Sequence, residues 1–163
     1  MNNWHQSQRG YFSGALYDLM AADESIYLVL VDLGYKTFDR HIKDFPKRVI
    51  LTGASEQAAL GIAVGLALQG KKPFIYTIAS FFLRCAETIS LYLEHEKIPV
   101  RLVGAGRNDD YKADGYSHNG TQAQKFIKQM DFTVGYPETK EQVPDIIKYM
   151  VEHDEPSFVS LTR

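Results

Sequence analysis

The sequence predicts an α/β fold in which a mostly parallel, six-stranded sheet lies between helices on both faces, in three layers. Short runs rich in Val, Ile and Leu alternate along the chain with longer segments whose apolar residues recur at helical spacing. Parallel strands need crossover connections, usually helices, and those helices cover both faces of the sheet. No linker, repeat or low-complexity stretch interrupts the alternation, so we expect one domain over 1–163.

The elements follow in order along the chain. We expect strands at 26–32, 48–52, 72–77, 98–104, 132–136 and 156–162. We expect helices at 9–24, 55–69, 80–97, 121–130 and 141–153. Two polar stretches, 33–47 and 105–120, are expected to be mostly loop. Pro144 predicts that the last helix either begins near it or is kinked there.

Composition excludes several classes of function. The 163 residues are 45% hydrophobic and 23% charged, with a formal net charge of -2. That charge offers no basic surface for nucleic acid or for an anionic membrane. A single cysteine, Cys85, excludes an internal disulfide and suits a reducing compartment. The polar start and the lack of a long apolar run predict a cytoplasmic protein without a signal peptide or membrane span.

Ligands of open parallel sheets bind beyond the carboxyl ends of the strands. Five features of this sequence are expected at that edge and are therefore expected to be neighbours. They are Asp32, the turn 53–56, the segment 77–84, the loop 104–119 and Arg163.

Glu56 is an acidic residue at the head of the Gly/Ala/Leu-rich run "GASEQAALGIAVGLALQG". One interpretation is structural, because a carboxylate in the first turn of a helix is stabilised by about 0.3–1 kcal/mol. The small residues of this run favour a second interpretation, because they predict that another element packs closely against this turn. A carboxylate removed from water holds a proton more readily and could pass it to a ligand nitrogen.

The segment "TIASFFLRCAETI" opens a helix directly after a strand. At least one of Phe81 and Phe82 must pack in the core, and the other could stack on a planar heterocycle at the mouth of the sheet. Arg84 lies in the same turn, where a solvated or ion-paired arginine is the commoner role. Cys85 has no histidine at a recognisable spacing and is expected to pack in the helix.

The loop "GAGRNDDYKADGYSHNG" is long enough to suggest a functional role. Asp114 and His118 lie four residues apart in it, but no third ligand is evident, so we predict no metal site on this chain. The loop lacks the third glycine of a dinucleotide fingerprint. The other histidines are expected at the surface: His5, His41, His95 and His153.

Taken together, these residues resemble a known family over nearly the whole chain. The motifs, in order, are "VDLG", "RVILTGASEQ", "PFIYTIASFFLRCAE", "IPVRLVG", "DGYSHNG" and "SLTR". With this order and spacing, the sequence is similar to the pyrimidine-binding domain of transketolase-like thiamine diphosphate enzymes. The resemblance implies the thiamine diphosphate-binding fold of that domain.

The resemblance also implies roles for individual residues. Glu56 matches the glutamate that hydrogen-bonds the cofactor's aminopyrimidine and favours its imino tautomer, which removes the thiazolium proton. Phe81 matches the aromatic residue that stacks on the aminopyrimidine, with Arg84 one turn further along the same wall. Asp32 matches an acidic residue near the cofactor, contributed across the interface between two subunits. Two matches concern the substrate: Asp114 and His118 contact sugar hydroxyls or the reacting carbonyl, and Arg163 holds its phosphate.

Two positions depart from the family pattern. Ile78 stands where many relatives carry a second aromatic residue, so one wall of the cofactor site is expected to be aliphatic. Gly106 stands where transketolases acting on sugar phosphates often carry a phosphate-binding histidine, which leaves Arg163 with less help. The sequence contains no diphosphate-binding domain with its Gly-Asp-Gly and Asn motif, which would hold Mg²⁺.

The resemblance therefore implies one subunit of a split transketolase, which transfers a two-carbon ketol unit between sugar or sugar-phosphate substrates. A diphosphate-binding subunit would supply the other half of the site and its Mg²⁺, in a heterotetramer with some self-association. One alternative is a subunit of a two-subunit thiamine-dependent decarboxylase or synthase, against which the "DGYSH" loop and Arg163 argue. Another is a non-catalytic regulatory domain, against which Glu56 argues. A generic nucleotide-binding domain lacks a phosphate loop here.

Overall fold

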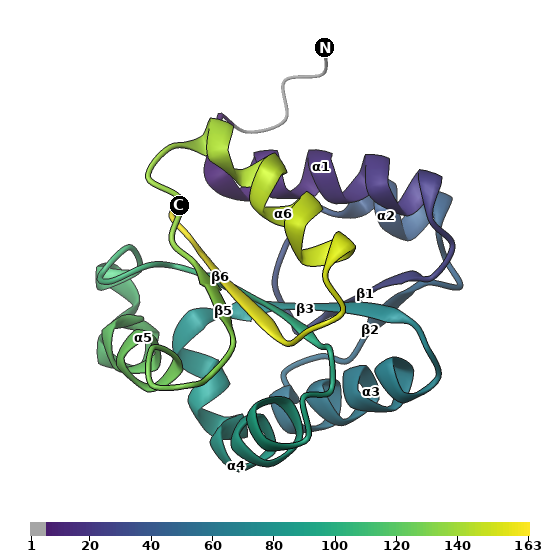
Figure 1. Cartoon of the computed structure of the whole chain (residues 1–163). Helices are drawn as coiled ribbons and strands as arrows, with labels where there is room; N and C mark the ends of the chain where they lie inside the picture. The colour runs from purple at the N-terminus through teal and green to yellow at the C-terminus, as the bar shows by residue number, and fades with distance from the viewer. Residues whose placement is uncertain (1–5) are drawn as a thin grey trace.

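A computed structural model describes residues 6–163, so His5 lies outside the described residues. Figure 1 shows one sheet with helices on both faces, which confirms the expected three layers. Its order is β2-β1-β3-β4-β6-β5, and all neighbouring strands are parallel. The strands are β1 (Ile26–Leu30), β2 (Val49–Leu51), β3 (Lys72–Ile78), β4 (Arg101–Ala105), β5 (Thr133–Gly135) and β6 (Ser157–Leu161).

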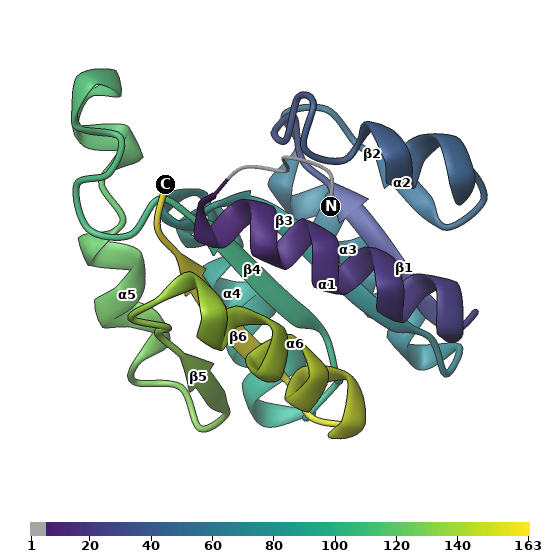
Figure 2. The ribbon, with the colours of Figure 1, turned by 90° about the horizontal axis from the view of Figure 1, so that it is seen from above.

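Each face of the sheet has its own core and its own helices. On one face lie α1 (Gln8–Ala22), α2 (Asp39–Asp44) and α6 (Val143–Glu152). On the other lie α3 (Glu56–Leu68), α4 (Ala86–Thr88) and α5 (Thr121–Ile127). The central strands β3 and β4 are almost wholly buried, as expected for strands covered on both sides. Figure 2, turned by 90°, shows α1 and α6 lying side by side over the sheet.

Several elements differ from the sequence-based expectation. The stretch 33–47 contains the short helix α2, whose six residues are too few to show helical periodicity. The expected helix over 80–97 is divided into a 3₁₀ segment (Ala79–Cys85), α4 and a π-helical segment (Ile89–His95). The long loop contains two short 3₁₀ turns, Lys112–Asp114 and Tyr116–His118. Pro144 lies in the first turn of α6, where its missing N–H costs nothing, so the helix begins there.

His41 corrects another expectation, because it is buried rather than exposed. Its ring lies edge-on to Tyr17 and Phe38, with centroids 5.3 and 5.2 Å away. Burial lowers the pKa of His41 to about 4, because the charged imidazole would lose its hydration. His95 and His153 are exposed and Cys85 is buried, as predicted.

The small residues of α3 divide between its two faces. Ala59, Ala63 and Ala67 are buried and pack towards the sheet. Gly61 and Gly65 are exposed, and a Cβ built on either would meet nothing within 4 Å. The close neighbour expected for this outward face is therefore absent from the described part of the chain.

Candidate active site

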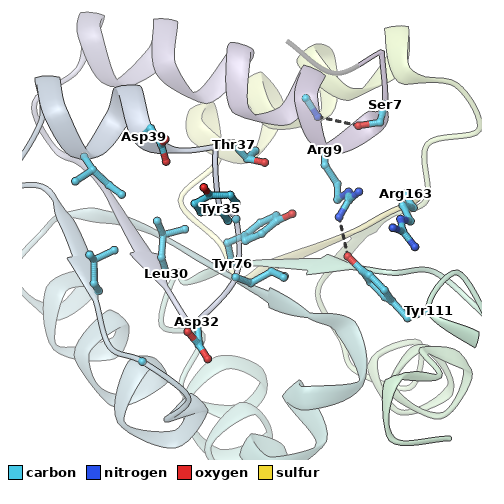
Figure 3. A pocket seen from close by; sticks show the side chains of 16 residues that line it. Ser7, Arg9, Leu30, Asp32, Tyr35, Thr37, Asp39, Tyr76, Tyr111 and Arg163 are labelled. Atoms are coloured by element: carbon cyan, nitrogen blue, oxygen red, sulfur yellow. Dashed lines mark hydrogen bonds between the residues drawn. The ribbon is translucent and has the colours of Figure 1, made fainter. Parts of the chain in front are cut away.

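The expected neighbours do gather at the carboxyl edge of the sheet, around two hollows. The larger is a pocket of about 680 Å³ between the start of α1, the segment after β1 and the loop after β4. Asp32, Tyr111 and Arg163 line it, as Figure 3 shows. The second hollow is formed by residues 54–58 and Arg84. Gly53 lines the first and Ala54 the second, so the turn between β2 and α3 separates them.

Glu56 is the first residue of α3, and only 4% of it is exposed. Its Oε1 accepts a hydrogen bond of 2.7 Å from Nη1 of Arg84, which forms an ion pair. The Arg84 guanidinium also lies over the ring of Phe81, 4.5 Å from its centroid. The carboxylate, the guanidinium and the aromatic ring therefore form one contiguous group.

The two adjacent phenylalanines have opposite environments, as the sequence required. Phe82 is fully buried and lies edge-on to Phe158, with centroids 6.1 Å apart. Phe81 is half-buried and faces the site, where the His118 ring lies edge-on at 5.1 Å. Ile78, at the end of β3, is 8% exposed and so contributes mainly to the core beneath the site.

The loop after β4 is held in place by hydrogen bonds that bring His118 to Phe81. The Ser80 hydroxyl donates to the carbonyl of Ser117 at 2.7 Å, which ties the loop to the 3₁₀ segment. The Ser117 hydroxyl lies 3.0 Å from Nδ1 of His118. Asp114, in contrast, is exposed and lines neither hollow. The structure thus brings His118 close to Phe81 but leaves Asp114 at the rim.

Two residues of the larger pocket were missed by the sequence analysis. Nη1 of Arg9 donates a hydrogen bond of 2.7 Å to the Tyr111 hydroxyl. Figure 3 shows Arg9 and Arg163 near the Tyr111 ring, and their guanidinium carbons are 5.9 and 5.7 Å from its centroid. Arg9 could have been found, because a helix that precedes a parallel strand begins at that strand's carboxyl edge. Tyr111 gave no such signal in the sequence.

A buried polar network fixes the three segments that carry these groups. The side chain of Gln8 donates to the carbonyl of Pro137 at 2.8 Å and accepts from the N–H of Thr162 at 2.8 Å. The Arg107 guanidinium donates to the carbonyls of Pro137 and Ser160, and burial lowers the pKa of Arg107. Arg9 and Arg163, each next to a member of this network, are thereby held at the same pocket.

The described residues include no cluster of three or more His, Cys, Asp or Glu side chains that could hold a metal ion. Within 6–163, no helix has both the length and the apolar character needed to cross a bilayer.

The family described as "Transketolase, pyrimidine binding domain" matches residues 5–163. The chain belongs to this family. The resemblance found in the sequence is thereby confirmed, and with it the expected fold.

Relatives and solved structures agree with the family. The chain is 28% identical over 158 residues to one subunit of the apulose-4-phosphate transketolase of Phocaeicola vulgatus, covering 95% of this chain and 51% of that protein. It is 29% identical over 134 residues to a 1-deoxy-D-xylulose-5-phosphate synthase of Fusobacterium nucleatum, covering 81% of this chain and 22% of that one. It therefore spans about half, or less, of the length of these relatives.

Two solved structures share the fold over 96% of this chain. A split gene transketolase, described as an inactive beta4 tetramer, superposes with a TM-score of 0.84 at 26% identity, and 52% of that chain is covered. The transketolase of Campylobacter jejuni superposes with a TM-score of 0.85 at 20% identity, and 26% of that chain is covered. The chain is therefore a transketolase-like pyrimidine domain.

Proposed function

We propose that this chain is the pyrimidine-binding subunit of a split transketolase-like enzyme of the cytoplasm. The enzyme transfers a two-carbon ketol unit from a ketose donor to an aldehyde acceptor, using thiamine diphosphate. The observation that carries the proposal is the buried Glu56 carboxylate next to the accessible ring of Phe81, at the carboxyl edge of a transketolase-type domain.

These residues fit the aminopyrimidine half of the cofactor. A planar heterocycle stacks favourably on an aromatic ring, and Phe81 offers one. A sheltered carboxylate can hold or give a proton at a ring nitrogen, which is the role we assign to Glu56. Ile78 adds aliphatic contact from the end of β3. When bound, the cofactor would supply the carbon nucleophile that ketol transfer requires.

In the chain alone, Arg84 contacts the two side chains that we assign to the aminopyrimidine of the cofactor. Its guanidinium contacts both groups that the aminopyrimidine would use, at 2.7 Å from Glu56 and 4.5 Å from the Phe81 centroid. More than half of the Arg84 side chain is exposed, so it can swing towards water without disturbing the core. Binding then exchanges one partner of Glu56 for another, with Arg84 remaining at the rim of the cofactor site.

The substrate would occupy the larger pocket and the loop above it. His118 lies next to Phe81, where it can bond the reacting carbonyl or a sugar hydroxyl. Asp114, on the exposed rim, would meet a more distant hydroxyl of the substrate. Arg163 and Arg9, which lie on the same side of the pocket, supply guanidinium donors for an anionic end group such as a phosphate.

A second subunit would complete the site by holding the diphosphate and Mg²⁺, and Asp32 lies exposed at the edge it would cover. Support comes from two relatives, one named as a transketolase subunit and the other a split gene transketolase described as an inactive beta4 tetramer. The outward face of α3 is uncharged from 57 to 70 and exposes apolar residues, which suits contact with protein. These residues are Ala58, Gly61, Ile62, Gly65 and Leu68. We propose a heterotetramer.

The similarity to 1-deoxy-D-xylulose-5-phosphate synthase favours a second candidate, a subunit of a two-subunit synthase or decarboxylase. The two functions differ in their donors, since a synthase would use a 2-oxo acid and release carbon dioxide. Carbon dioxide release from a 2-oxo acid, without ketol transfer from a ketose, would establish the alternative.

Calorimetric titration with thiamine diphosphate tests whether this chain forms only one half of the cofactor site. The chain alone offers one stack and one or two hydrogen bonds of about 0.5–1.5 kcal/mol each, too little to offset the loss of rigid-body freedom. We therefore expect negligible binding by this chain, and binding together with ketol transfer once a diphosphate-binding subunit and Mg²⁺ are added. Micromolar, Mg²⁺-dependent binding to the chain alone would refute the proposal.

A further inference from the structure

Tyr111 occupies the space that a side chain at position 106 would need. Gly106 follows β4 with a φ of +82°, a conformation that favours glycine. A Cβ built on it would lie 2.3 and 2.4 Å from two carbons of the Tyr111 ring. Tyr111 is 8% exposed and forms part of the wall of the larger pocket. Gly106 therefore lets Tyr111 come in from the loop and form that wall.

The hydrogen bond to Arg9 orients the Tyr111 hydroxyl. A guanidinium can only donate, so the phenolic oxygen is the acceptor in the 2.7 Å bond. The hydroxyl can still donate its own proton, and within residues 6–163 no group accepts it. The hydroxyl is thus a free donor whose oxygen is already fixed by Arg9.

Charge at this end of the pocket favours an anion. Figure 3 shows Arg9 and Arg163 on the side of Tyr111, whereas Asp32 and Asp39 lie elsewhere around the pocket. The nearby carboxylate of Asp110 accepts from the backbone N–H groups of Arg107 and Arg163 rather than from either pocket guanidinium. Arg9, Arg163 and the Tyr111 hydroxyl therefore face this end of the pocket with donors to spare.

We propose that Tyr111 is a specificity-determining residue whose hydroxyl donates to a phosphate ester at the end of the substrate, between Arg9 and Arg163. A phosphate has enough acceptor oxygens to take all three donors at once. The inference rests on the proposed function for the sugar that carries the phosphate. The phosphate contact itself needs only this chain.

Titration of the full chain with inorganic phosphate, followed by amide chemical shifts, tests the contact. Tyr111→Phe keeps the ring over Gly106 and removes only the hydroxyl, so we expect the dissociation constant to rise about tenfold, as for one hydrogen bond to a charged group. Tyr149→Phe is the control, because Tyr149 is an exposed residue of α6 away from the pocket. It should bind phosphate as the wild type does.

Unchanged or tighter phosphate binding by Tyr111→Phe would overturn the inference, as would a wild-type chain that binds no phosphate. In the assembled enzyme, Tyr111→Phe should raise KM for a phosphorylated aldehyde and leave KM for the unphosphorylated aldehyde unchanged. Equal effects on both would also overturn it. A chain that binds phosphate through Tyr111 but supports no ketol transfer with its partner would refute the proposed function alone.

Discussion

Arg101 at the amino edge of the sheet and the Glu56 and Tyr111 groups at the carboxyl edge use their hydrogen bonds in different ways. At the amino edge, Arg101 is fully buried, and its guanidinium donates to the carbonyls of Met150, Pro99 and His153 at 2.7, 2.7 and 3.2 Å. The last turn of α6 is thereby closed by a cation, which its dipole favours. Arg101 also lies 3.6 Å from a carboxylate oxygen of Asp154. Each of these donors and acceptors is used within the chain.

At the carboxyl edge, polar groups outside the Gln8–Arg107 network keep unused bonding capacity. Here the Arg84 guanidinium shares one short bond with Glu56, and the Tyr111 hydroxyl keeps an unused proton. Backbone strain also occurs at this edge, where the non-glycine residues Asp32, Lys36 and Asn108 have positive φ values. The comparison indicates that the Arg101 charge is used within the fold, whereas Glu56 and the Tyr111 hydroxyl keep bonding capacity for the ligand that we propose.

Glu56→Gln should have the largest effect of these variants on turnover of the assembled enzyme. A small effect would contradict the comparison between the two edges. Glutamine keeps the shape and an oxygen that can accept from Arg84, so folding should change little. It cannot carry the proton, and the loss of acid–base catalysis costs about 10²–10⁴-fold in rate. Turnover of the assembled enzyme and NMR exchange of the cofactor's thiazolium proton measure this loss.

The matched control for that experiment is Glu87→Gln, an exposed carboxylate on α4. It should leave both rates unchanged. Thiazolium exchange at the wild-type rate in the Glu56→Gln enzyme would contradict the role of Glu56 as the proton-transferring group.

Arg101→Met should show the opposite pattern at the amino edge. The variant leaves the buried Met150 carbonyl and the part-buried carbonyls of Pro99 and His153 without their donor. Breaking such a network around a buried charge costs about 3 kcal/mol of unfolding free energy. Urea denaturation measures the cost, and turnover per folded enzyme should be unaffected. Lys148→Ala, which removes an exposed ion pair to Glu152 on α6, should cost below about 0.5 kcal/mol. Equal losses of unfolding free energy in the two variants would mean that the burial of Arg101 contributes nothing to stability.

Much of the fold could be predicted because it depends on local periodicity. The six strands and the helix after Glu56 are read from runs of β-branched residues and from helical spacing. The helix α2 has only six residues and no side-chain cap, so it offered no comparable signal. The burial of His41 depends on contacts with Tyr17 and Phe38, which only the tertiary structure brings together.

Prediction of the candidate site was limited in the same way, because local patterns do not reveal long-range contacts. Family motifs pointed to Glu56, Phe81 and His118, and the structure brings these near one edge. The Arg9–Tyr111 contact joins residues 102 positions apart, so no local pattern could indicate it. It also depends on the space above Gly106, which the sequence analysis could interpret only as a missing histidine. Long-range contacts and empty volumes are properties of the packed chain.

Phe81→Ala should have the smallest effect on the assembled enzyme. It allows a site residue and a core residue, Phe81 and Phe82, to be compared within a single turn. Phe81 faces the site, whereas its neighbour Phe82 is fully buried against Phe158. Loss of the Phe81 stacking face should weaken thiamine diphosphate binding to the assembled enzyme by about two- to tenfold, since a stack contributes about 0.5–1.5 kcal/mol. Phe82→Ala should instead cost about 3–5 kcal/mol of unfolding free energy by opening a cavity. Calorimetry for the cofactor and urea denaturation for stability separate the two effects. If Phe82→Ala lowered cofactor affinity more than Phe81→Ala did at equal folded fraction, the ring that stacks on the cofactor would have been assigned to the wrong residue.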